Sequence, residues 1–412
     1  MTKNDRHADA PETSANATTA SPEQLQHVAE RLMQWAQTRR FEGIDPYDAL
    51  NSPLAPLISL GTRYGRIALT QLLRRSPINL RPILLIKPGA NPKAFALFLE
   101  GCVALRDVTN ARFLARRLLD LRSDAVKHSA WGYNFPWQNR FQLLPANTPT
   151  IVNTSFAAHA LLDLVDLLSD HDSDSNSPED ATLCEDALGA ALDSAKFILN
   201  DLNRLDDGED AFCFSYTPED RNFVHNANML GASLLARLAV RHGAAELLAH
   251  ARAALRYSMR RQHDDGSWFY AERREQNWID SFHTGFNLEA LRRCLALGVA
   301  EEYRARYSLG VNFYAERFFL DDGTPKYYAD RVYTVDVHAP AEAICFFAKE
   351  PGYADLTRRV TGWLLDNLYD EKRGTFWFRK SARITIKTTY MRWTQAWAFR
   401  ALAAAITAPH KH

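Results

Sequence analysis

The sequence predicts an all-α fold, an (α/α)6 toroid in which an inner ring of helices is wrapped by an outer ring. Apolar residues recur with helical periodicity along most of the chain, and strand alternation is scarce. Turns of glycine and aromatic residues also recur at Gly266, Gly323 and Gly374, an interval of about 50 residues that accommodates two helices. The repeat unit is therefore predicted to be a helical hairpin.

The individual helices are predicted from periodicity and from start signals. Ser21 as N-cap and Pro22 as the first helical residue open a helix that runs to about Arg40. The segment 41–92 is rich in proline and holds at most one helix, at 53–73. The other predicted helices lie at 92–106, 109–122, 153–169 (with Asn153 as N-cap), 181–203, 222–242, 244–262, 279–297, 300–319, 340–349, 353–369 and 390–405.

These helices alternate in character along the chain. One set is amphipathic, with Arg and Glu on one side, and the other is apolar nearly all round except at its start. A helix that is apolar on all sides must be enclosed, which favours two concentric rings. An open solenoid is the alternative, but it would expose one side of every apolar helix. We therefore expect a single toroid domain at 21–406, preceded by a disordered tail at 1–20.

Composition narrows the class of protein. The chain has 412 residues, with 49 Lys and Arg against 49 Asp and Glu, so no global basic field favours nucleic acid as a partner. No run of about 20 uninterrupted apolar residues predicts an integral membrane segment. The polar N-terminus lacks the apolar core of a signal peptide, and the five scattered cysteines fit free thiols in a reducing compartment. We expect a cytoplasmic protein.

Two resemblances to known families add to this prediction. Residues 262–268 (Gln-His-Asp-Asp-Gly-Ser-Trp) match the Q-x(2–5)-G-x-W turn of terpenoid-cyclase and prenyltransferase toroids. Over about residues 90–405 the chain more closely resembles toroid proteins of bacterial exopolysaccharide clusters, the polysaccharide biosynthesis proteins of the VpsJ type. That resemblance is carried by residues 131–138, 153–156 and 278–287, and more loosely by 336–338. It implies a role in polysaccharide biosynthesis, in contact with the assembly machinery, without implying a particular reaction.

The candidate chemistry lies at the starts of the apolar helices. Asp280, His283 and Asn287 line one face of the first two turns of their predicted helix, while deeper residues on that face are apolar. In a toroid such a helix end borders a pocket. Two further helix starts carry a histidine with acids or amides: His225 with Asn228, and His338 with Asp336 and Glu342.

These residues allow both functional and structural interpretations. Asp280, Asn153 and Glu342 could simply cap helices or favour the helix dipole, but capping does not require imidazole. We predict that His283 acts as a base oriented by Asp280, with His338 or Tyr216 as the opposing acid. The i, i+4 pair of His338 and Glu342 could also bind a divalent ion. Because no zinc-site spacing occurs, we expect neither metal nor cofactor.

Aromatic residues provide the second line of evidence. Trp131, Tyr133, Phe135 and Trp137 occupy alternate positions ahead of a predicted inner helix, with Asn134, Gln138 and Arg140 close by. Aromatic faces stack on pyranose rings, while guanidinium and amide groups bind hydroxyls and carboxylates. Wedging between helices is the structural alternative for such residues. The remaining predicted substrate-binding residues are Asn153, Asn228, Asn287, Glu342, Tyr328 and Trp393.

The predicted function is a carbohydrate-active enzyme that modifies a polysaccharide or lipid-linked oligosaccharide as an epimerase, lyase or hydrolase. A hydrolase needs paired carboxylates, whereas the candidates here are His and Tyr, which favours an epimerase or lyase. A terpenoid cyclase or prenyltransferase is one alternative, although the DxDD and DDxxD motifs are missing. A non-catalytic glycan-binding component of the assembly machinery is the other.

Overall fold

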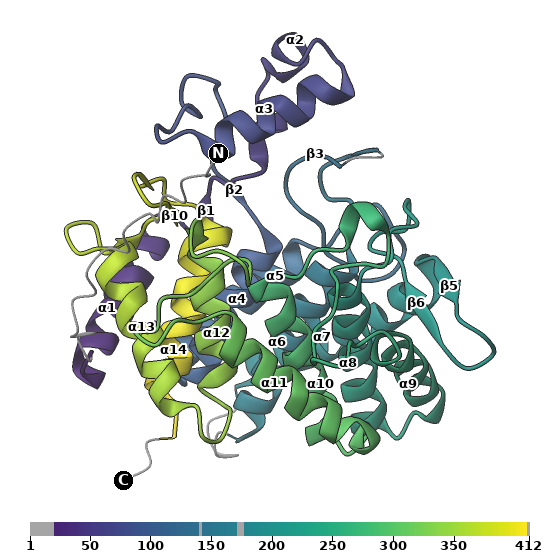
Figure 1. Cartoon of the computed structure of the whole chain (residues 1–412). Coiled ribbons are helices and arrows are strands. Elements are labelled where there is room, and N and C mark those ends of the chain that lie inside the picture. Colours follow the sequence, from purple (N-terminus) through teal and green to yellow (C-terminus); the bar gives the residue numbers. More distant parts are fainter. Residues whose placement is uncertain (1–19, 140–141, 171–176, 410–412) are drawn as a thin grey trace, which may run out of the picture.

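Six helices form a closed inner ring in the computed structural model, which describes residues 20–139, 142–170 and 177–409 (Figure 1). They are α4 (Pro92–Ala104), α6 (Ile151–Asp170), α8 (His225–His242), α10 (Ser281–Ala296), α12 (His338–Phe347) and α14 (Trp397–Ile406). Each helix packs against the next, and α14 returns to α4. The ring is therefore closed, as the toroid prediction requires.

Six further helices surround this ring. They are α1 (Pro22–Gln37), α5 (Val108–Asp120), α7 (Pro178–Lys196), α9 (Ala245–Met259), α11 (Arg304–Arg317) and α13 (Ala354–Leu368). Five of them follow the inner helix that they cover, whereas α1 covers α14 at the other end of the chain. The first and last helices of the toroid thus complete one hairpin. The predicted (α/α)6 fold is confirmed.

Burial separates the two rings as the sequence pattern indicates. All ten residues of α12 are buried, while α5 buries only the stripe containing Ala111, Leu114 and Leu118. Among the described helices, α6 alone has the length and hydropathy of a membrane span, and 89% of that stretch is buried inside the protein. Its apolar character is accounted for by its place in the inner ring.

Two predicted helix starts are wrong by a short distance. Asn153 is not an N-cap, because α6 begins at Ile151 and the Asn153 backbone N–H donates to Thr150 Oγ1 at 3.0 Å. The helix expected to begin at Pro340 begins at His338. The segment expected as one helix at 390–405 starts with a π-helical turn, Met391–Ala396, that leads into α14.

The repeated glycine turns join neighbouring outer helices. Gly266 has φ +91°, and a Cβ there would lie 2.5 Å from the backbone of Leu309 in α11. A Cβ on Gly323 would likewise clash with the backbone of Arg359 in α13, and Gly374 lies against the side chain of Arg31 in α1. Each turn after one outer helix therefore seats on the next. The Gln262 side chain fixes this arrangement by donating to the carbonyls of Gly266 and Arg306, at 2.9 and 3.0 Å.

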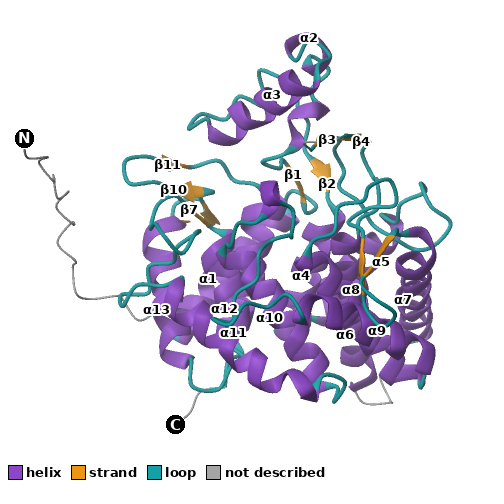
Figure 2. Ribbon diagram, turned by 45° about the vertical axis from the view of Figure 1, so that its right-hand side comes forward, coloured by secondary structure: helices purple, strands orange, loops and turns teal. Residues whose placement is uncertain are grey.

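The proline-rich segment forms a separate projection, which we call the entry lobe (residues 41–91). It contains α2 (Ala55–Ile58) and α3 (Arg63–Arg75) and stands above the ring at the N-terminal ends of the inner helices (Figure 2). Buried Arg81 fastens it by donating to Asp48 Oδ1 at 2.7 Å and to the Tyr390 hydroxyl at 3.0 Å. The entry lobe is therefore anchored next to the start of α14.

The strands are short and lie in the connections between helices. They are β1 (Glu42–Gly43), β2 (Gly89–Ala90), β3 (Trp137–Gln138), β4 (Leu143–Leu144), β5 (Arg204–Asp206), β6 (Phe212–Phe214), β7 (Val335–Asp336), β8 (Tyr369–Asp370), β9 (Thr375–Phe376), β10 (Arg379–Lys380) and β11 (Thr385–Ile386). All of their pairings are antiparallel, and β11, β10 and β7 form a three-stranded sheet.

We expect Gly266→Ala to lower the free energy of unfolding by about 3 kcal/mol, because the left-handed backbone and the contact with Leu309 both oppose a Cβ. Gly208 is the control. It also has positive φ (+73°), but a Cβ there would meet nothing within 4 Å, so Gly208→Ala should cost only about 1 kcal/mol. Thermal denaturation of both variants measures the difference, and equal losses would contradict the seating of the turn on α11.

Candidate active site

His283 and Asp280 form an oriented pair at the start of α10. Nδ1 of His283 lies 2.7 Å from Oδ2 of Asp280, and Oδ1 of Asp280 accepts the His283 backbone N–H at 3.0 Å. Because a carboxylate only accepts hydrogen bonds, the imidazole donates from Nδ1, and Nε2 is left for another partner. The Trp278 indole N–H also donates to Oδ2, at 2.9 Å. Asp280 is therefore both the N-cap of the helix and the orienting carboxylate.

His338 lies in an aromatic cage at the start of α12. Its ring contacts Phe282, Trp393 and Trp397 at centroid distances of 4.5, 4.6 and 4.3 Å. The residue is buried, and neither ring nitrogen has a hydrogen-bond partner among the described residues. Burial lowers its pKa well below the ordinary value, and the charges of Lys93 and Arg392 lower it further. The imidazole is consequently neutral at pH 7.

The two imidazoles converge on one phenyl ring. Phe282 lies 4.1 Å from the His283 ring and 4.5 Å from the His338 ring, measured between centroids. Phe286 also contacts both rings, at 6.1 and 5.7 Å. The structure thus brings Asp280, His283 and His338 together from two successive repeats.

Two cations lie beside these histidines. Lys93 Nζ is buried 4.1 Å from the ring centroid of Phe156, and burial lowers its pKa well below the ordinary value. Arg392 is also buried and donates through Nε and Nη2 to the two carboxylate oxygens of Asp45, at 2.7 and 2.8 Å. The site therefore holds one fixed positive charge and one amine whose charged form is disfavoured by burial.

A group of half-buried aromatics forms one wall of the site. The Tyr133 and Tyr216 hydroxyls lie 3.2 Å apart, and the Trp137 ring packs 6.0 Å from the Tyr216 ring. The Arg392 guanidinium lies 4.9 Å from the Tyr133 ring, which connects this wall to the charged part of the site. Burial raises the pKa of Tyr216 well above its ordinary value, so its phenol keeps its proton at neutral pH.

A second group of aromatics comes from the segment before α12 and from the π-helical turn that leads into α14. Tyr328 pairs through its backbone with Asp280, and its neighbour Tyr327 contacts Phe282 at 5.6 Å. Trp393 contacts His338, and its indole nitrogen has no partner among the described residues. Both predicted residues, Tyr328 and Trp393, are therefore next to the histidine pair.

Buried amides supply further polar groups at this end of the ring. Both polar side-chain atoms of Asn153 lack a partner among the described residues, and so do the Oδ1 atoms of Asn226 and Asn287. Asn287 lies one turn beyond His283 on α10. Because buried polar atoms are nearly always hydrogen-bonded, these amides are suited to bind hydroxyl groups. No group of three or more His, Cys, Asp or Glu that could hold a metal ion occurs in the described part of the chain.

Three predicted site residues have hydrogen-bond partners within the protein. Trp131 is fully buried and donates from Nε1 to the Leu118 carbonyl at 2.8 Å, which places it in the α5 hairpin. Both ring nitrogens of His225 are engaged, by Ser258 at 3.1 Å and by Glu272 at 2.8 Å. Asn228 donates to the Ala254 carbonyl at 2.7 Å. The side chains of His225 and Asn228 are therefore held by partners within the protein, and their role in the site stays a prediction.

The two carboxylates predicted to orient His338 also have other partners. Asp336 accepts the backbone N–H of His338 at 3.2 Å and pairs with Arg379 at 3.4 Å, so it caps α12 and leaves the imidazole free. Glu342 is buried one turn further along and pairs with Arg400. Arg140, the remaining predicted substrate-binding residue, lies outside the described residues.

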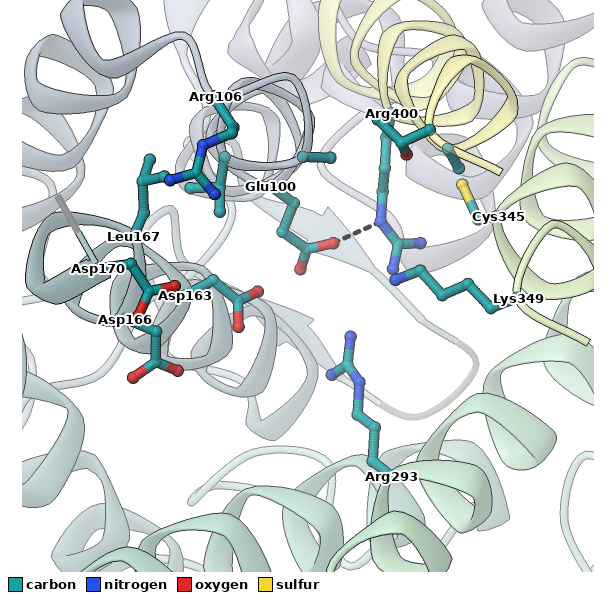
Figure 3. A pocket seen from close by; sticks show the side chains of 14 residues that line it. Glu100, Arg106, Asp163, Asp166, Leu167, Asp170, Arg293, Cys345, Lys349 and Arg400 are labelled. Atoms are coloured by element: carbon teal, nitrogen blue, oxygen red, sulfur yellow. Dashed lines mark hydrogen bonds and ion pairs between the residues drawn. The ribbon is translucent and has the colours of Figure 1, made fainter. Parts of the chain in front are cut away.

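Arg400 forms an ionic floor below the histidines. Its guanidinium pairs with Glu100 of α4, with Glu289 of α10 at 2.7 Å and with Glu342 of α12 at 3.4 Å. Beyond this floor, at the C-terminal ends of the inner helices, lies a cavity of about 350 Å³ lined by charged groups that include Asp163, Arg293, Lys349 and Arg400 (Figure 3). The candidate site and this cavity are thus separated by the Arg400 ion network.

Sequence reasoning missed Lys93, Arg392, Asp45 and Phe282. Lys93 follows Asn91 and Pro92 at the start of an apolar helix, so the rule that singled out His283 could also have singled it out. The pairing of Asp45 with Arg392 could not be found in this way, because 347 positions separate the two residues.

No family model matches this chain, and no curated protein matches it either. Several solved structures, however, match it in fold. A sugar epimerase from a ruminal bacterium is 12% identical, with a TM-score of 0.57, over 79% of this chain and 91% of that chain. A cellobiose 2-epimerase from Bacillus thermoamylovorans is 13% identical, with a TM-score of 0.55, over 78% and 89%. A D-mannose isomerase is 10% identical, with a TM-score of 0.58, over 96% and 99%.

At these identities the similarity establishes the fold alone. The chain has the α/α toroid that is also found in sugar epimerases and glycoside hydrolases. Its reaction must be inferred from the residues of the site.

We expect Lys93→Met to stabilise the protein at pH 7, because the unfolded chain protonates this amine while the folded chain disfavours its charge. The gain should be roughly 1–2 kcal/mol and should shrink as pH rises towards about 10, where the unfolded lysine also loses its proton. Thermal denaturation at pH 7 and pH 9 measures this. A destabilised variant would show that the ammonium is well solvated or paired.

Proposed function

We propose that this protein is an acid/base enzyme acting on a sugar, of the epimerase type, with a lyase as the related alternative. The observation that carries the proposal is the pair of imidazoles on Phe282, one oriented by Asp280 and the other buried without a hydrogen-bond partner among the described residues. Epimerisation needs two such groups, one on each side of the reacting carbon.

The reaction removes and returns one proton. The neutral His338 imidazole takes the proton from a carbon next to a carbonyl or carboxylate group, and the bonding electrons move onto the oxygen of that group. His283, which enters the reaction protonated on both ring nitrogens and paired with Asp280, returns its Nε2 proton to the opposite face of the same carbon. In the reverse direction the two histidines exchange roles. Asp280 stabilises His283 when it is protonated, and the lowered pKa keeps His338 neutral and ready to accept a proton.

The neighbouring cations suit the charge that develops in this reaction. A proton leaving carbon generates a negatively charged oxygen, which Arg392 and a protonated Lys93 would stabilise at short range in a buried site. The Tyr216 phenol, which retains its proton, offers a neutral donor on the aromatic wall. Tyr133, Trp137 and Trp393 provide ring faces for the sugar.

Hydrolysis fits the site less well. A glycosidase uses two carboxyl groups, one of which must donate a proton while the other attacks or activates water. The carboxylates near the histidines all have basic partners: Asp45 with Arg392, Asp280 with His283, Asp336 with Arg379 and Glu342 with Arg400.

A terpenoid cyclase is the second candidate because the inner ring also contains an apolar aromatic cluster, including Phe156, Phe286 and Trp397. Such an enzyme must stabilise a carbocation. Arg392 would oppose this, because like charges repel strongly in a buried site. The positive surroundings therefore favour an anionic intermediate.

The proposed substrate class is supported by the similar solved structures and by the sequence resemblance, in addition to the site itself. The similar solved structures include a sugar epimerase and a cellobiose 2-epimerase, which supports a sugar substrate. The resemblance to exopolysaccharide-cluster proteins supports a polysaccharide or lipid-linked oligosaccharide, a cytoplasmic location and contact with the assembly machinery. We propose these assignments together with the reaction.

We expect His283→Gln and His338→Gln each to reduce turnover by about 1,000-fold, because each removes one of two proton-transfer groups. The measurement is deuterium incorporation from D2O into candidate sugars and lipid-linked oligosaccharides, followed by NMR. His128→Gln is the matched control, since His128 also pairs with an aspartate, at 3.2 Å, but that partner is Asp193 of the outer helix α7.

The proposed enzyme would be contradicted if the wild-type protein binds a glycan but incorporates no deuterium into it, and if neither substitution changes that binding. It would instead identify a non-catalytic glycan-binding component. Binding of terpenoid diphosphates without binding of sugars would favour the cyclase.

A further inference from the structure

The entry lobe exposes an unusual number of large apolar side chains. Of the eighteen that are exposed in the described part of the chain, nine lie in this lobe. Leu60 is 80% exposed, and Leu57 and Tyr64 are each 75% exposed. The others are Leu54, Ile58, Leu72, Ile78, Ile83 and Leu85. A concentration of exposed apolar side chains in one small lobe points to an interaction site.

The fold of the lobe does not require these residues. Its small core consists of Leu69 and Leu73 from α3, packed on Ala49, Ala55 and Ile86. The apolar side chains of the outer surface are additional to this core, and each of them is at least 36% exposed. Exposing these side chains to water costs free energy, and the folding of the lobe does not offset that cost.

The charge of this region is one-sided. Between Asp48 and Glu100 the sequence has no Asp or Glu, although the whole chain has equal numbers of acidic and basic residues. Arg66, Arg74 and Arg81 face inward, toward Gln138, Tyr47 and Asp48 respectively. The basic side chains that remain exposed are Arg63, Arg75 and Lys87. The apolar surface is thus accompanied by uncompensated positive charge.

We propose that the entry lobe docks this protein on an anionic phospholipid bilayer. The exposed Leu, Ile and Tyr side chains enter the boundary between headgroups and acyl chains, and Arg63, Arg75 and Lys87 contact the phosphates. Apolar burial combined with attraction to anionic lipid is the physical basis of peripheral membrane binding. A segment without acidic residues fits a uniformly negative surface better than it fits a protein partner of mixed charge.

The docked orientation would point the candidate site toward the bilayer. The lobe stands at the N-terminal ends of the inner helices, where the histidines lie (Figure 2). The hairpin of β10 and β11 lies at the same end and exposes Ile384 beside Arg383 and Lys387. Only the following step rests on the proposed function. If that function holds, this orientation suits a lipid-linked oligosaccharide as the substrate, because its lipid part would lie in the bilayer.

Vesicle flotation tests the docking surface without any sugar substrate. The full chain is mixed with phosphatidylcholine vesicles that contain either no anionic lipid or about 30% phosphatidylglycerol, at low and high salt. We expect binding to the anionic vesicles that weakens with salt. Leu57→Ser with Leu60→Ser, and separately Arg63→Glu with Arg75→Glu, should each weaken binding by roughly tenfold or more.

Val240→Ser with Arg252→Glu is the matched control, since both side chains are exposed but lie on α8 and α9, away from the lobe. It should leave binding unchanged. Circular dichroism establishes that every variant is folded. The proposal is overturned if the wild-type protein stays unbound, if neutral and anionic vesicles bind equally, or if the control loses as much binding as the lobe variants.

A second copy of the chain is the other occupant to be tested. The membrane assignment would be overturned if the wild-type protein dimerises in solution and does not bind vesicles, and if the Leu57→Ser, Leu60→Ser variant no longer dimerises. Deuterium incorporation into a soluble sugar should be unchanged in the lobe variants. Failure of docking and failure of the proposed chemistry are therefore separate results.

Discussion

The structure depends on one buried guanidinium, Arg400, which joins helices from opposite sides of the inner ring. It pairs with carboxylates from α4, α10 and α12, and it lies on α14, the helix that closes the toroid. Taking these groups out of water costs several kcal/mol per ion, so the network is a poor source of stability by itself. Its effect is to fix how the four helices meet. It also divides the centre of the ring into an aromatic upper part and a charged lower cavity.

The upper part combines groups that rarely occur together. His338 is buried among aromatic rings close to Lys93 and Arg392, and these charges contribute to its lowered pKa. His283, in contrast, is partly exposed and anchored by Asp280. Two imidazoles in different surroundings, with positive charge nearby, suit a reaction in which a proton leaves carbon and negative charge develops on oxygen. The fold that this chain shares with sugar epimerases can accommodate such a reaction, but the residues carry the inference.

Sequence reasoning succeeded where the information was local. Helical hairpins could be predicted from periodicity and glycine turns, and the spacing of Asp280 and His283 placed both groups on one helical turn. Sequence reasoning failed for side chains that could face either the site or a neighbouring helix. Trp131 resembles a sugar-binding residue in its segment, yet its indole closes a hairpin by bonding to Leu118. Long-range pairs such as Arg400 with Glu100, 300 positions apart, left no local pattern. The balanced total charge likewise concealed the basic entry lobe.

The central claim is that a sugar binds above the Arg400 network, beside the two histidines. A crystal structure of the protein with a bound sugar or unreactive analogue tests it most directly. The account predicts sugar density in contact with both His283 and His338, with a ring face on Trp393 and hydroxyls on Asn153 or Asn287. Density confined to the lower cavity beside Asp163 and Lys349, or to the outer surface, would contradict it.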